Sequence, residues 1–185
     1  LPDGTSGEEM ALCFEQRRSR RLLVIPPLFD EANKFRHQLS EIMRRLDEGG
    51  VDCFLPDLPG CNESKAPLQA QTLAGWRQAV GAAAAHFGAA HVLAVRSGCW
   101  LVPDDVPAAL YAPAKPAQVL RNMLRARVLA ARETGHPETA EALLDDTYTR
   151  FRRVMGDRHP DTPRIHEILL AIREILARAP ASLHA

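Results

Sequence analysis

The sequence lacks several features that mark large classes of proteins. Its 23 basic and 23 acidic side chains cancel, so no excess charge draws the chain toward nucleic acid or an anionic membrane surface. It has no apolar run near the roughly 20 residues that cross a bilayer. Aromatic residues make up only 5% of the chain, but the apolar fraction of 46% is that of a folded domain. We therefore expect a folded protein with no nucleic-acid partner and no membrane span.

The cysteines exclude a familiar kind of site. No two of them form a Cys-x-x-Cys pair, and no histidine stands at a zinc-ligand spacing from them: Cys13, Cys53, Cys61 and Cys99. The sequence therefore predicts no metal and no cofactor. Residues 1–9 are polar and acidic, unlike a secretory signal peptide, and are either an upstream extension or a cloning remnant. Together these features indicate a cytoplasmic protein with free thiols.

Up to about residue 110, short apolar runs alternate with longer amphipathic segments. Strands are expected at residues 11–14, 21–25, 51–55, 91–95 and 109–112. Helical periodicity predicts helices between them, at 34–47 and from the N-cap Thr72 to Phe87, with Gly49 and Gly88 as their ends. Strands that alternate with helices in this way favour parallel pairing with right-handed crossovers. The predicted fold class is α/β, with three α/β/α layers around a mostly parallel sheet.

The strand pattern stops after about Pro113. Helices are predicted over residues 118–134, 139–155 and 163–179. We therefore expect two domains, an α/β core of residues 1–115 and a helical C-terminal region of residues 116–185. A sheet of four or five strands leaves an exposed edge, so a homodimer is a further expectation.

Three segments, in this order, resemble α/β-hydrolases. Residues 56–60, Pro-Asp-Leu-Pro-Gly, with Ser64 behind them, resemble the loop after one hydrolase strand. Residues 72–76, followed by an alanine-rich helix, resemble the approach to the next strand. Residues 91–97 resemble that strand and the sharp turn after it, the nucleophile elbow. The resemblance covers about residues 10–135 and implies a truncated α/β-hydrolase-like core.

A fourth segment resembles a narrower group. The loop of residues 26–34, Pro-Pro-Leu-Phe-Asp-Glu-Ala-Asn-Lys, is similar to that of the exosortase-A-system-associated hydrolases of bacterial exopolysaccharide loci. This resemblance implies an association with exosortase and exopolysaccharide systems.

The resemblance also implies a candidate catalytic site. Ser97 takes the place of the nucleophile, and the backbone N–H groups of Gly98 and Leu28 take the place of the oxyanion hole. The implied chemistry is hydrolysis of a small-molecule ester or acyl compound. The Gly-x-Ser-x-Gly pattern, however, reads Val-Arg-Ser-Gly-Cys over residues 95–99, and both flanking glycines are replaced.

The catalytic base is harder to place. A serine nucleophile needs a histidine held by an acid, which in this fold follows on later strands. His136 and His159 instead precede predicted helices. Ser97 is therefore either a nucleophile or a residue that ends a strand or caps a helix. The alternative to an esterase is a non-catalytic hydrolase-like protein that acts through protein–protein interaction.

The C-terminal helices offer a candidate surface for such an interaction. Residues 152–162 resemble the stretch between helices of tetratricopeptide repeats of the kinesin-light-chain type, a likeness we extend to about residues 136–180. The resemblance implies a groove of paired helices that binds a protein partner.

Overall fold

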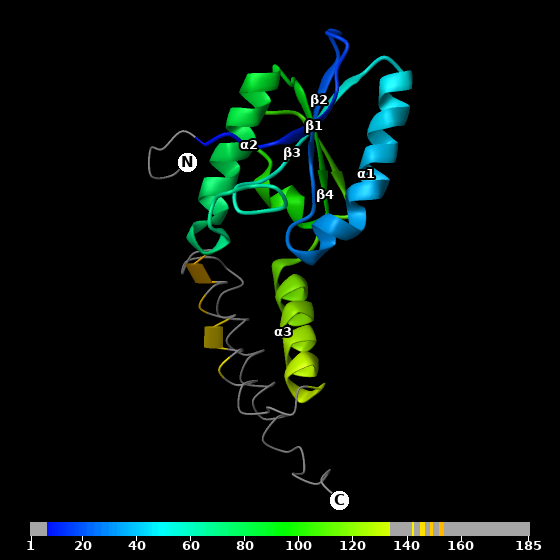
Figure 1. Cartoon of the computed structure of the whole chain (residues 1–185). Coiled ribbons are helices and arrows are strands. Elements are labelled where there is room, and N and C mark those ends of the chain that lie inside the picture. Colours follow the sequence, from blue (N-terminus) through cyan, green and yellow to red (C-terminus); the bar gives the residue numbers. More distant parts are fainter. Residues whose placement is uncertain (1–6, 134–141, 143–144, 147–148, 150–151, 154–185) are drawn as a thin grey trace, which may run out of the picture. The chain divides into compact units, whose positions relative to one another are not determined.

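The computed structural model describes residues 7–133, 142, 145–146, 149 and 152–153, and it divides the chain into two units, residues 1–114 and 115–185. Figure 1 shows the elements of the first unit, which are β1 (Ala11–Phe14), β2 (Arg21–Ile25), α1 (Asp30–Glu48), β3 (Asp52–Pro56), the 3-10 helix η1 (Leu68–Ala70), α2 (Leu73–Phe87), β4 (His91–Val95), the 3-10 helix η2 (Arg96–Leu101) and β5 (Ala108–Tyr111). The second unit contains α3 (Pro116–Glu133), and its described residues from 142 to 153 are also helical.

The five strands form one sheet in the order β1-β3-β2-β4-β5. β2 pairs in parallel with β3 and with β4, and β4 pairs in parallel with β5. Only β1, at one edge, runs antiparallel to its neighbour β3. Helices α1 and α2 cover opposite faces of this sheet (Figure 1). The predicted three-layer α/β/α architecture with a mostly parallel sheet is therefore confirmed.

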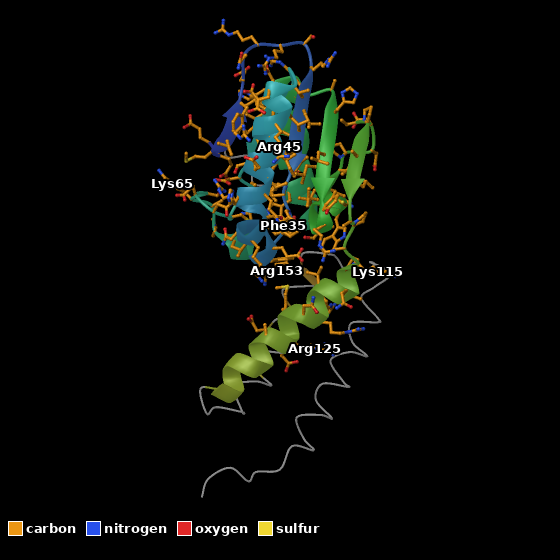
Figure 2. All side chains as sticks on the ribbon, turned by 90° about the vertical axis from the view of Figure 1, so that its right-hand side faces the viewer. Phe35, Arg45, Lys65, Lys115, Arg125 and Arg153 are labelled. Carbon is orange, nitrogen blue, oxygen red and sulfur yellow. The ribbon has the colours of Figure 1, made fainter. Side chains whose placement is uncertain are left out.

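The central strands β2, β3 and β4 are largely buried on both faces of the sheet, as their continuous apolar runs predict. On the α1 face a core of six buried side chains forms: Val24, Leu39, Met43, Cys53, Leu55 and Val95. Figure 2 shows α1 in front of the sheet, with Phe35 and Arg45 on it. On the other face α2 packs against β2 and β3 and buries Leu73, Trp76, Val80 and Ala84. The indole N–H of Trp76 donates to the carbonyl of Pro59 at 2.9 Å, so this tryptophan is both buried and satisfied.

The ends of the helices follow local chemistry. The Thr72 hydroxyl accepts a hydrogen bond from the Gly75 N–H, which confirms the predicted N-cap of α2. Gly88 ends this helix in the left-handed conformation, at φ 59°. The prediction for α1 was wrong at its start, because the helix begins at Asp30 rather than at residue 34. Its first turn carries only one apolar residue, the small Ala32, so periodicity alone detects it poorly.

Most of the predicted C-terminal helices, at 139–155 and 163–179, lie outside the described residues. So do His136, His159 and most of the tetratricopeptide-like stretch. Among the described residues, no helix has the length and apolar content needed to span a membrane.

Candidate active site

The two strands that follow β2 in the sequence lie on opposite sides of it in the sheet. From β2 the chain crosses over α1 to β3 on one side, and from β3 it crosses over α2 to β4 on the other side. In open α/β sheets, ligands bind outside the carboxyl ends of the strands at such a reversal, which here are β2 and β4. The candidate site is therefore the place where the loop after β2, residues 26–29, meets the turn after β4, residues 96–98.

The structure brings the three predicted site residues together at this place. The Leu28 N–H donates to Ser97 Oγ at 2.8 Å, although 69 positions separate the two residues. Gly98 follows directly, and a Cβ added to it would lie 2.3 Å from the carbonyl oxygen of Pro26. Ser97 is fully buried, with 0% exposure. The backbone donor predicted for the oxyanion hole thus binds the serine hydroxyl itself.

Arg96, which directly follows β4 as the first residue of η2, has the strained backbone conformation of this turn. Its φ is 56°, in the left-handed region that a side chain rarely adopts. A nucleophile elbow holds its reactive residue on a sharp, strained strand-to-helix turn, which raises that side chain above the sheet. Here the strained residue is Arg96, and Ser97 comes one position later.

Sequence reasoning did not single out Arg96, although a signal for it exists. Ala94 and Gly98 stand two positions before and after it, which is the spacing of the small residues in Gly-x-Ser-x-Gly. Centred on Arg96, the motif keeps its second glycine. We call residues 94–98 the elbow from here on.

No protein-family model and no curated protein matches this chain. Solved structures do match it. A carboxylesterase structure from the ammonia-oxidizing thaumarchaeon Nitrososphaera gargenis is 14% identical, covers 96% of this chain and 71% of its own, and has a TM-score of 0.51. The described core has the α/β-hydrolase fold. A structural match at this low sequence identity shows the fold alone and nothing of the activity.

Two further solved structures match with lower TM-scores. Mouse alpha/beta hydrolase domain-containing protein 10 is 12% identical over 94% of this chain and 99% of its own, with a TM-score of 0.49. A protein from Agrobacterium vitis S4 is 17% identical over 60% of this chain, with a TM-score of 0.42. This chain spans 54% of the Agrobacterium protein, about half its length.

No described histidine stands near Ser97 in this α/β-hydrolase fold. His91 is the first residue of β4, so it lies at the opposite end of that strand from the elbow. His37 lies within α1 and His86 near the end of α2, and both are exposed. Among the described residues there is also no group of acidic, cysteine and histidine side chains that could hold a metal ion.

Proposed function

We propose that this chain is a non-catalytic α/β-hydrolase-like protein that acts by binding. The observation that carries this proposal is Arg96 at the strained position of the elbow, with Ser97 buried behind it. A guanidinium stays protonated in proteins, so it is neither a nucleophile nor a general base. A binding role keeps the sheet and needs no catalytic triad.

A second candidate function is hydrolysis of an ester or acyl compound, with Ser97 as nucleophile and the N–H groups of Gly98 and Leu28 as oxyanion hole. The observation behind it is that the predicted nucleophile and one predicted donor lie side by side, with Leu28 N 2.8 Å from Ser97 Oγ. This function requires Ser97 to become exposed and a base to reach it.

Turnover of p-nitrophenyl acetate separates the two functions. We expect the wild-type chain and Ser97→Ala to hydrolyse the ester at the same slow rate, as does Ser40→Ala, a control on α1. The alanine leaves the buried Leu28 N–H unpaired at a cost of about 1–3 kcal/mol, so circular dichroism must show that the variant is folded. A fall of about a hundredfold or more in the folded Ser97→Ala variant alone would establish the nucleophile and reject the binding role.

The cellular setting is also a proposal. The resemblance of residues 26–34 supports an association with exosortase and exopolysaccharide systems. Four free thiols, at Cys13, Cys53, Cys61 and Cys99, support a cytoplasmic location. The tetratricopeptide-like stretch supports a protein partner that binds through residues 136–185, for which the sequence predicts helices. A coding sequence that lies outside any exopolysaccharide locus would count against the first of these.

We also propose a homodimer through β5, the edge strand beside β4. All four residues of β5 are exposed, Leu110 by 54% and Tyr111 by 60%, and none carries a charge that would discourage pairing with another strand. In sedimentation velocity we expect a dimer that Leu110→Lys converts to a monomer. Leu68→Lys, at an exposed leucine of η1, serves as the control and should leave the dimer intact. A wild-type chain that sediments as a monomer at every concentration contradicts the proposal.

A further inference from the structure

Strained backbone conformations are concentrated beyond the carboxyl ends of neighbouring parallel strands. Among the described residues, five that are not glycine have positive φ angles, and three of these directly follow or lie close behind the neighbouring strands β2, β4 and β5: Phe29 (φ 61°), Arg96 (φ 56°) and Ala112 (φ 45°). A side chain in this conformation is strained, so it persists only where the surrounding structure enforces it. Strain of this kind concentrates at ligand-binding and catalytic sites.

Arg96 connects the three strained segments. Its Nη2 donates to Glu31 Oε1 at 3.1 Å, two residues beyond Phe29, and its Nη1 donates to the Ala112 carbonyl at 3.4 Å. Its own carbonyl accepts from the Ala114 N–H at 3.2 Å. The guanidinium has five donors, and the described partners use two of them. The elbow therefore presents a partly exposed cation with unused hydrogen-bonding capacity at the carboxyl ends of β2 and β4.

The ion pair with Glu31 does not by itself account for the strain. The side chains of Arg96 and Glu31 are 32% and 31% exposed. Pairs this open to water contribute little, so the ion pair does not hold Arg96 in its left-handed conformation. The tight backbone approach of Gly98 to Pro26 fixes the turn, and it leaves the Arg96 guanidinium partly exposed.

The fit between the two side chains is also incomplete. Glu31 contacts the guanidinium through Oε1, whereas its other oxygen, Oε2, is buried and has no hydrogen-bond partner among the described residues. A carboxylate that meets an arginine with both oxygens forms the stronger, bidentate pair. Arg96 thus holds one carboxylate in a poor geometry at a place where a better-oriented one could replace it.

We propose that Arg96 binds the carboxylate of a small ligand at the carboxyl ends of β2, β4 and β5, and that Glu31 occupies the guanidinium when the ligand is absent. This inference rests on the proposed binding role and names its ligand class. A singly charged carboxylate is favoured over phosphate because Glu31 stays nearby. A dianion would meet stronger repulsion from the Glu31 carboxylate.

Titration of the full chain with sodium butyrate, followed by ¹H–¹⁵N correlation spectra at constant ionic strength, tests the proposal. We expect Glu31→Gln to lower the dissociation constant for butyrate by roughly threefold or more, because the competing carboxylate is gone. Arg96→Gln should weaken binding by about tenfold or more, because the charge-assisted pair is lost. Arg44→Gln, at an arginine paired with Glu41 on the exposed face of α1, is the matched control and should bind as wild type does.

Several results overturn the proposal. These are absence of butyrate binding by both the wild-type chain and Glu31→Gln, equal binding by a folded Arg96→Gln, weaker binding by Glu31→Gln, and tighter binding of phosphate or of neutral butyramide than of butyrate. Weaker binding by Glu31→Gln is the result expected if the Arg96–Glu31 ion pair is purely structural, because the loss of such a pair cannot improve the affinity for a ligand. The Glu31→Gln and butyramide comparisons decide even if Arg96→Gln fails to fold. Ester turnover through Ser97 is a separate readout, so failure of the binding role and failure of this ligand assignment are distinguishable.

Discussion

Gly98→Ala is expected to lower the free energy of unfolding by about 3 kcal/mol or more, the upper range for overpacking a tight site. The added Cβ would lie 2.3 Å from the carbonyl oxygen of Pro26 and 2.9 Å from that of Ile25. Both obstacles are backbone atoms at the end of β2, so no side chain can rotate away. Either η2 moves off the sheet or the end of β2 bends.

Gly81→Ala is the matched control, because Gly81 lies inside α2 and an added Cβ there meets nothing within 4 Å. It should raise the free energy of unfolding by about 0.5–1 kcal/mol, since alanine is the better helix former. Urea unfolding followed by circular dichroism measures both variants. Equal midpoints for Gly98→Ala and the wild-type chain would mean that η2 does not press on β2 as the structure places it.

The same close approach shows why the fold was more predictable than the site. The strands were found as apolar runs, and these runs are buried on both faces of the sheet, as at the fully buried neighbours Leu23 and Val24 of β2. Both ends of α2 were found because the caps Thr72 and Gly88 act through local chemistry that needs no contact with a distant segment. These features are properties of short segments, and short segments are what a sequence displays.

The elbow is different because its geometry depends on a contact across 69 positions, from Leu28 to Ser97. Sequence matching centred the motif on the only hydroxyl available, at Ser97. Which residue takes the strained conformation is decided by where the backbone can approach β2, and Gly98 permits this approach two positions after Arg96. A glycine at that spacing was visible, but its role depends on a neighbour that the sequence does not identify.

Asp52→Ala should also lower the free energy of unfolding by about 3 kcal/mol, the lower range for breaking a buried ion pair. Asp52 is fully buried, at the start of β3. Its carboxylate accepts from the Gln16 N–H at 3.1 Å, from the Arg18 N–H at 2.8 Å and from Arg18 Nη1 at 3.2 Å. One side chain thus holds the connection between β1 and β2. Its removal takes the acceptor from the Gln16 and Arg18 N–H groups, whereas Arg18 Nη1 keeps its bond to Asp47 Oδ1. Ser40→Ala, which loses only a hydrogen bond to the carbonyl of His37 on α1, is the control.

The effect of Asp52 should depend on pH. Burial by itself raises the pKa of Asp52, but the N–H groups of Gln16 and Arg18 and the charge of Arg18 outweigh it, so the pKa lies below its ordinary value. A lowered folded-state pKa means that the stabilisation is complete above the unfolded-state pKa, about 3.9, and is lost as the pH falls through the folded-state value. The stability difference between the wild-type chain and Asp52→Asn should therefore be constant from pH 7 to about pH 5 and shrink below about pH 4. A difference that stays the same in acid would show that the shape of the side chain, and not its charge, holds the connection between β1 and β2.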